Sequence, residues 1–443
     1  MKRVAAAGGE LVNITSLSHD GRGVAHVDGK AVFVAGALPG EKVRLGARFR
    51  HRRFDEAELA DVVEPSAERV APRCAAFGVC GGCALQHLEP RAQVAAKQEH
   101  LLEELRRIGR VAPEEVPDPL VADVWGYRRR ARLGAKFVPR KGRVLVGFRE
   151  RLSPYIAELE RCEILAPPLD ALIVPLSEML TSLTIRSQVP QIEVAVADNA
   201  SALVFRVLAP PVDADLAALS DFGTRHGVQI HLQPGGIDTI APLGGVEPLR
   251  YRLPEYDVEL EFQPADFIQV NGPLNRRMVA RALGLLRAGP SDSVLDLFCG
   301  LGNFTLPIAR GARRVVGVEG EAALVERARA NARRNGIANA EFHVANLADD
   351  STGQGAGATG RAWSAERFEA VLLDPPRAGA LEILPITARC GALRVVYISC
   401  HTGSLARDAG ILVHEHGFKL RSAGVMDMFP HTAHVESLAV FER

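Results

Sequence analysis

The chain has 443 residues, of which 47% are hydrophobic and 24% are charged. This length exceeds what one hydrophobic core supports and predicts two or three domains, and the composition is ordinary for a globular protein. Its 53 Lys and Arg balance 53 Asp and Glu, so nucleic-acid binding would depend on a local basic patch rather than on overall charge.

The first residues carry no pattern of a targeting segment. They are too short and too polar for the apolar region of a signal peptide. No apolar run in the chain approaches the roughly 20 residues of a membrane span. We therefore expect a cytoplasmic protein without membrane contact. Its seven Cys should stay reduced there and serve in ligation or catalysis rather than in disulfides.

Residues 1–67 are predicted to form a small OB-like β-barrel. Turn dipeptides separate its short strands, and Asp28-Gly29 fits a two-residue hairpin. The predicted strands are 11–14, 23–27, 30–34, 41–45 and 57–63. Barrels of this kind often bind RNA, and basic residues cluster in this one: Lys42, Arg44, Arg48, Arg50, Arg52 and Arg53. We interpret the cluster as an RNA contact, with a solvated strand edge as the alternative.

A group of cysteines follows the barrel. Cys74, Cys80 and Cys83 are separated by five and then two residues, and Cys162 is a fourth thiol far downstream. Four thiolates can hold zinc or an iron–sulfur cluster. The spacing leans slightly to a cluster, because zinc sites usually consist of two CxxC-like halves. Unrelated buried thiols are the remaining interpretation.

Residues 68–265 are predicted to form a central α+β domain. Apolar residues at helical spacing predict a structural helix over 91–109. Residues 127–152 hold ten Lys or Arg against one acid, with aromatic residues between them, which is typical of a groove for single-stranded RNA. A solvated charged face is the alternative. Further short strands are predicted at 191–196, 202–207 and 228–232.

From residue 266 to 443 strands and helices alternate, which predicts a doubly wound, Rossmann-like sheet. The strand ending at Leu297 runs into a glycine turn, and the next strand ends in Glu319, where a carboxylate can bind ribose hydroxyls. Thr305 replaces the third glycine of a dinucleotide fingerprint, and Asp296 before the turn favours S-adenosylmethionine (SAM) instead of NAD. Asn346 follows the third strand and is placed to meet an adenine edge. Residues 351–362 are predicted to be a flexible loop.

Two later strands end in reactive side chains. Cys400 follows the strand Arg394–Ser399, and Asp374 follows the strand Ala370–Leu373. Ligands bind at the carboxyl edge of open α/β sheets, so we interpret Cys400 as a nucleophile. Glu436 begins a strand that we expect opposite the active edge, and it is a candidate general base. His431 and His434 are rivals for that role, although a structural histidine is the commoner case.

These groups suit methylation at C5 of uracil. C5 is a poor nucleophile until a thiolate adds to C6 and produces an enolate. The activated C5 can then take a methyl group from SAM, and a base must remove the C5 proton before the thiolate leaves. A base that reacts in this way has to leave its stack to enter the pocket.

The chain resembles the bacterial SAM-dependent RNA (uracil-5-)-methyltransferases over nearly its whole length. It is most similar to the 23S rRNA enzymes that carry an amino-terminal TRAM domain and a [4Fe–4S] cluster. The resemblance implies a TRAM barrel over residues 8–65, with Cys400 as nucleophile and Glu436 as base. It implies that the cluster ligands are Cys74, Cys80, Cys83 and Cys162. It also implies a SAM site at Gln269, Phe298, Asn303, Glu319, Asn346 and Asp374, and packing of helix 91–109 against the methyltransferase domain.

The expected partner is 23S rRNA with a flipped uridine, and no obligate protein partner is evident. Relatives that modify tRNA typically lack the barrel and the cluster, which favours rRNA; another RNA remains the alternative substrate. The sequence departs from the family at His401, where Asn usually follows the nucleophile. An N-methyltransferase is less consistent, because Arg377 stands where those enzymes place an aromatic residue after Asp-Pro-Pro. An RNA-binding iron–sulfur protein without activity would leave Cys400 and Glu436 unused.

Overall fold

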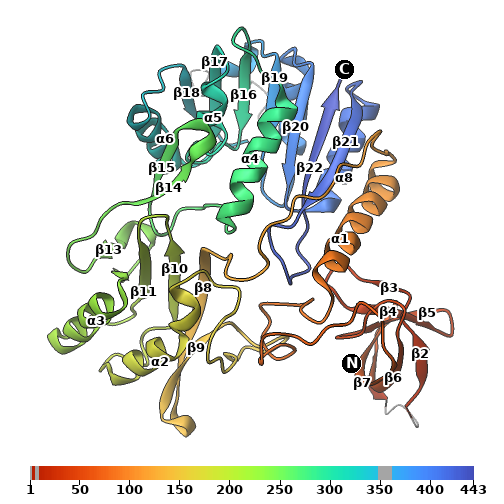
Figure 1. The fold of residues 1–443 in the computed structure, drawn as a ribbon, viewed down its shortest axis with the longest axis vertical. Helices are drawn as coiled ribbons and strands as arrows, with labels where there is room; N and C mark the ends of the chain where they lie inside the picture. The colour runs from red at the N-terminus through yellow and green to blue at the C-terminus, as the bar shows by residue number, and fades with distance from the viewer. Residues whose placement is uncertain (1, 5–8, 348–361) are drawn as a thin grey trace.

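The computed structural model describes residues 2–4, 9–347 and 362–443. Residues 351–361 of the predicted glycine-rich loop therefore lie outside the described residues. Figure 1 shows three parts: a carboxyl-terminal α/β domain at the top, a central domain at the lower left and an amino-terminal β domain at the lower right. The domain boundaries expected from the sequence, at residues 67 and 265, stay predictions.

The amino-terminal domain is a seven-stranded sheet in the order β1-β6-β7-β5-β4-β3, with β2 also paired to β6. Asp28 and Gly29 join β4 to β5 with positive φ values of 51° and 77°. Positive φ at both central residues is the requirement of a type I′ hairpin turn, so this prediction is confirmed. The strands are β1 (Lys2–Val4), β2 (Leu11–Asn13), β3 (Ser16–Leu17), β4 (Gly23–Val27), β5 (Lys30–Val34), β6 (Lys42–Arg50) and β7 (Asp55–Glu64).

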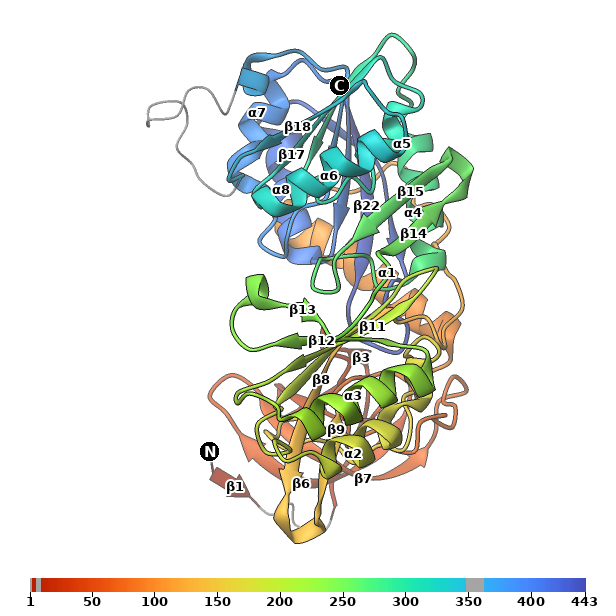
Figure 2. The same ribbon diagram turned by 90° about the vertical axis from the view of Figure 1, so that its left-hand side faces the viewer.

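The central domain is a six-stranded sheet in the order β13-β12-β11-β10-β8-β9. Two helices, α2 (Ile173–Ser182) and α3 (Asp213–His226), lie on one face of it (Figure 2). Three of its strands fall where the sequence predicted them. Its strands are β8 (Arg130–Val138), β9 (Arg143–Gly147), β10 (Gln191–Val196), β11 (Ser201–Arg206), β12 (Gln229–Gln233) and β13 (Ala241–Pro242).

The carboxyl-terminal domain is a seven-stranded sheet in the order β18-β17-β16-β19-β20-β22-β21. The first five strands are parallel, and β22 runs antiparallel to both of its neighbours, so the edge strand β21 has the same direction as β20. Successive residues of β20 enter different cores: Val396 and Ile398 pack on one face, Val395 and Tyr397 on the other. Burial on both faces explains the uninterrupted apolar runs of these strands.

Its strands are β16 (Ser293–Leu297), β17 (Arg314–Glu319), β18 (Ala340–Val344), β19 (Ala370–Leu373), β20 (Arg394–Ser399), β21 (Lys419–Met426) and β22 (Glu436–Glu442). The helices are α4 (Gly272–Leu286), α5 (Thr305–Ala309), α6 (Ala322–Arg334), α7 (Leu384–Arg389) and α8 (Thr402–His414).

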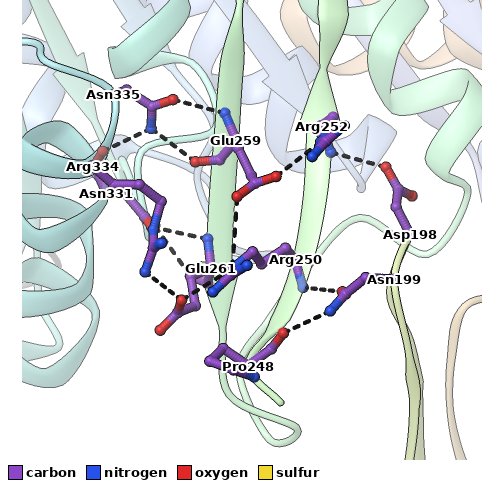
Figure 3. A network of polar contacts seen from close by, with 10 residues as sticks. All are labelled: Asp198, Asn199, Pro248, Arg250, Arg252, Glu259, Glu261, Asn331, Arg334 and Asn335. Carbon is purple, nitrogen blue, oxygen red and sulfur yellow. Dashed lines mark hydrogen bonds and ion pairs between the residues drawn. The ribbon is translucent and has the colours of Figure 1, made fainter.

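A two-stranded hairpin, β14 (Leu249–Leu253) and β15 (Val258–Phe262), joins the central domain to this sheet (Figure 3). The main-chain N–H groups of Glu259 and Glu261 donate to Asn335, the C-cap of α6, and to Asn331 within α6, at 2.8 and 2.9 Å. On its other side, Asn199 of the central domain bonds the main chain on both sides of residue 249. The hairpin thus contacts both domains, and the boundary at residue 265 stays a prediction.

The helix after the cysteines packs on the carboxyl-terminal domain, although it lies far from it in the sequence. It consists of α1 (Pro90–Glu104) and a π-helical turn, Leu105–Gly109. Val94, Leu101 and Leu105 belong to the same core as β20 and α8. In Figure 1 this helix lies beside β21 and α8. Of the residues described, none form a helix long and apolar enough to cross a membrane.

Candidate active site

Cys400 and Glu436 lie together at the carboxyl edge of the parallel sheet. Cys400 directly follows β20, and Glu436 is the first residue of β22. Because β22 is antiparallel to β20, with Ser437 paired to Ser399, its start meets the end of β20. The expectation that Glu436 lies opposite the active edge is therefore wrong: the carboxylate is on the same edge as the thiol.

Cys400 lines a cavity of about 310 Å³, which is within the range of small-ligand pockets. The walls come from segments far apart in the sequence. His19 and Asp20 belong to the amino-terminal domain, and Gly81 and Gly82 belong to the cysteine-rich segment. The remaining walls come from Ala84 and His100, from Arg377, His401 and Thr402, and from residues 432–435. The amino-terminal domain, the segment from the cysteines to α1 and the carboxyl-terminal domain thus meet at the thiol of Cys400.

Burial and negative charge set the protonation states at this edge. Burial, with the neighbouring charges of Glu436 and Asp374, raises the pKa of Cys400 to about 11. Burial and the charge of Asp374 raise the pKa of Glu436 to about 8, and burial raises that of Asp374 to about 7. The Arg377 guanidinium opposes the first two shifts. A bound cation would lower all three pKa values and favour the reactive thiolate and carboxylate.

The predicted SAM residues surround the end of β16. Glu319 accepts hydrogen bonds from the N–H groups of Gly300, at 3.2 Å, and of Gly320 and Glu321, so it holds the glycine turn closed against β17. Phe298 has a φ of 66°, which turns the chain sharply after the strand. Asn303 exchanges two 3.0 Å hydrogen bonds with Asn275.

The other predicted SAM residues lie in loops of the carboxyl-terminal domain. Asn346 follows β18, Gln269 lies in the loop before α4, and Asp374 follows β19. Sequence reasoning gave Asp296 no ligand role, yet it is fully buried, and its pKa is raised to about 7 by burial and by the charges of Asp374 and Glu319. The charges of Asp374 and Glu319 therefore reach the buried Asp296 at the end of β16.

The four predicted cluster ligands line one small cavity: Cys74, Cys80, Cys83 and Cys162. Burial and the neighbouring thiols raise the pKa of Cys83 to about 12. A metal centre bound to these thiols would deprotonate them. Nevertheless, no group of three or more His, Cys, Asp or Glu among the described residues is arranged to hold a single metal ion.

The two histidines near the catalytic edge have different surroundings. His431 is stacked on Trp125, its N–H donates to Gln93, and its carbonyl accepts from Ala84 and Leu85 at 2.9 Å. These contacts tie the cysteine-rich segment to the loop before β22, which is a structural role. His434 instead lines the cavity at Cys400, and His431 is not among the described residues that line it.

Much of the basic stretch 127–152 is engaged in ion pairs. Arg130 and Arg132 pair with Glu193, and Arg129 pairs with Asp198 at 2.6 Å. Lys141 and Arg143 share Glu158. Cations that already hold carboxylates contribute less to an RNA surface than the sequence count suggests. RNA binding by this stretch stays a prediction.

Comparison with known proteins agrees with this arrangement. Residues 250–443 match the family model described as tRNA (Uracil-5-)-methyltransferase, and residues 10–47 match the TRAM domain. The fold and site thus define a SAM-dependent class I methyltransferase with an amino-terminal TRAM domain.

Two relatives of nearly equal length indicate a narrower family within this class of methyltransferases. The 23S rRNA (uracil(1939)-C(5))-methyltransferase of Alkalilimnicola ehrlichii is 53% identical, over 98% of this chain and 96% of its own. The enzyme of the same name from Xanthomonas campestris is 52% identical, over 97% of this chain and 96% of its own. The chain belongs to this family of 23S rRNA (uracil-C5)-methyltransferases.

A solved tRNA enzyme shows how far the fold alone can indicate the RNA substrate. The Pyrococcus abyssi tRNA (uracil-54, C5)-methyltransferase, solved with S-adenosyl-L-homocysteine, has a TM-score of 0.74 and 25% identity, over 98% of this chain and 100% of its own. Full-length correspondence of the fold therefore does not separate enzymes that act on rRNA from those that act on tRNA. The much higher identity to the rRNA enzymes is what favours rRNA.

Proposed function

We propose that this protein methylates C5 of one uridine in 23S rRNA, the position 1939 for which its relatives are named. The observation that carries the proposal is the meeting of Cys400 and Glu436 at one sheet edge, in a cavity formed by three parts of the chain. The enzyme acts through a covalent bond between Cys400 Sγ and C6 of the uracil.

The chain's own groups account for the steps on the uracil. Cys400 Sγ, as thiolate, bonds C6, and the electron pair of the C5–C6 double bond moves toward O4 as an enolate. The Arg377 guanidinium beside the thiol favours the thiolate form. After C5 is methylated, Glu436 takes the C5 proton, the double bond re-forms and the thiolate leaves.

SAM, when bound, supplies an electrophilic methyl group on a positively charged sulfur. The residues that would hold it are Gln269, Phe298, Asn303, Glu319, Asn346 and Asp374. Support for this set comes from the carboxyl groups of Glu319 and Asp374, whose charges act on the same buried Asp296. An excess of negative charge is the complement that a sulfonium needs in a partly desolvated site.

The target is tested by mapping 5-methyluridine in RNA from cells that lack this protein. Loss of the modification at position 1939 of 23S rRNA, and its return with a plasmid copy, is the expected result. Because a tRNA enzyme shares the full-length fold, tRNA is mapped in the same samples. Loss of 5-methyluridine from tRNA alone would replace the rRNA target.

We also propose that Cys74, Cys80, Cys83 and Cys162 hold a [4Fe–4S] cluster. The shared cavity of the four thiols supports it. Protein purified without oxygen should be brown and contain about four iron and four sulfide per chain. Replacing Cys83 with Ser should remove most of the iron, whereas the same change at Cys390, a buried thiol in another core, should leave it. A colourless protein with stoichiometric zinc would contradict the proposal.

A further inference from the structure

His401 directly follows Cys400 and is the N-cap of α8. Its Nδ1 accepts a hydrogen bond from the N–H of Ser404 at 3.1 Å. Its carbonyl accepts from the N–H of Leu405 at 3.1 Å. An N-cap acceptor satisfies one of the N–H groups that the first helical turn leaves without a partner. Because Nδ1 accepts, the hydrogen-bond network assigns the proton of the neutral ring to Nε2.

The ring of His401 lines the same cavity as Cys400. Within the ranges that the structure describes, the bond from Ser404 is the ring's one hydrogen bond. Nε2–H is therefore a donor available to a molecule in the cavity. Burial and the charge of Arg377 lower the pKa of His401, which keeps the ring neutral in this state.

Most of the ionisable groups that act on this ring are basic, whereas Glu436 and Asp374 act on the neighbouring Cys400. The charges that act on His401 come from Arg377, from His100 and Glu104 of α1, and from His19 of the amino-terminal domain. The single acid among them, Glu104, is already paired with Arg107. His100 Nε2 lies 3.2 Å from the hydroxyl of Thr402, the first residue of α8. Donors from three separated segments thus meet where the helix dipole also favours negative charge.

We propose that the Nε2–H of neutral His401 donates a hydrogen bond to a backbone phosphate of the RNA strand that carries the target uridine, beside the guanidinium of Arg377. The inference rests on the proposed function, because a uridine seated over Cys400 brings its own phosphates to the mouth of this cavity. The cap and the contact depend on each other: the bond at Nδ1 both orients the ring and keeps the donor on Nε2.

Three substitutions of His401 distinguish its role as the N-cap of α8 from its proposed hydrogen bond to phosphate. His401→Ser keeps an N-cap acceptor but is too short to reach the strand. His401→Asn keeps the acceptor and an amide N–H donor, and His401→Ala has neither. In full-length enzyme with loaded SAM, Ser should raise KM for RNA about tenfold with kcat within about twofold, and Asn should restore most of the loss. Only Ala should also lower the melting temperature.

The acceptor is identified with short RNAs in which one phosphate beside the uridine is a neutral methylphosphonate. Each methylphosphonate is used as its separate Rp and Sp isomers. The penalty of His401→Ser should vanish on the isomer whose methyl group replaces the accepting oxygen, because the two changes then remove the same bond. The salt dependence of RNA binding should be unchanged in His401→Ser, because a neutral donor displaces no counterion. In Arg377→Gln its slope should fall by about 0.7.

Different results overturn different claims. A wild-type KM in His401→Ser, or a penalty that persists on every methylphosphonate RNA, overturns the phosphate contact. A loss confined to kcat would assign the ring to the chemistry at the pyrimidine and would overturn it as well. If the wild-type enzyme transfers no methyl group to any uridine RNA, the proposed function itself fails.

Discussion

Replacing Cys400 with Ala is expected to lower methyl transfer to RNA by about 10⁴-fold or more. Without the thiolate that adds to C6, C5 of uracil is not activated. Cys400 lines a cavity and is only partly buried, so the change should leave folding nearly intact. The measurement is transfer of radiolabelled methyl groups from SAM to 23S rRNA, compared with Cys390→Ala, a buried thiol that lies away from the cavity.

An RNA with 5-fluorouridine at the target tests the bond itself. Fluorine at C5 replaces the proton that has to leave, so the adduct forms and persists. The wild-type enzyme and Cys390→Ala should each give a protein–RNA band that survives denaturing electrophoresis, and Cys400→Ala should give none. A fully active Ala variant, or an adduct that maps to another residue, would end the nucleophile assignment.

Strands and turns could be predicted from the sequence where the local hydrophobic pattern agrees with the burial of the side chains. Apolar runs buried on both faces gave the parallel strands, and Asp28-Gly29 gave a turn that few other dipeptides form as readily. The end of each strand then placed Cys400 and Asp374 at one edge, since parallel strands share the direction of their ends. The position of Glu436 required knowing that β22 runs antiparallel to β20, and local sequence does not contain that information.

The walls of the cavity could not be predicted, because they depend on contacts across hundreds of residues. Lys97 of α1 donates to Asp427 at 2.6 Å, and both side chains are almost fully buried. This pair fixes the loop before β22 against a helix 330 positions earlier in the chain. The chain carries six other Lys and many other Asp, and local sequence does not distinguish this pair from them, so only the fold selects it.

In the basic stretch 127–152, the sequence alone overstates how many cations are available to RNA. A count of ten cations takes no account of Glu193 and Glu158, which lie outside the stretch and pair with Arg132 and Arg143. His401 was noticed only as a departure from the family. Its role as a helix cap depends on the N–H of Ser404, which the structure places against the ring.

Replacing Glu436 with Gln is expected to trap the enzyme on its RNA. Gln has the shape of Glu but cannot take the C5 proton, so the methylated adduct should form and then fail to resolve. Loss of a positioned base lowers a rate by about 10²–10⁴-fold. A covalent enzyme–RNA complex should therefore accumulate with unmodified uridine RNA and SAM, and turnover should stop after one methyl group per enzyme.

The pH dependence distinguishes a base from a structural carboxylate. The pKa of Glu436 is raised to about 8, so its proton-accepting form becomes more abundant as pH rises through this value. Resolution of the wild-type adduct should accelerate from pH 6.5 to pH 8.5, and Glu436→Gln should show neither the rate nor the rise. Glu442→Gln, at the far end of the same strand, is the matched control and should resolve its adduct normally. Normal turnover by Glu436→Gln would assign proton removal to another group, and His434, which lines the cavity, would be the next residue to replace.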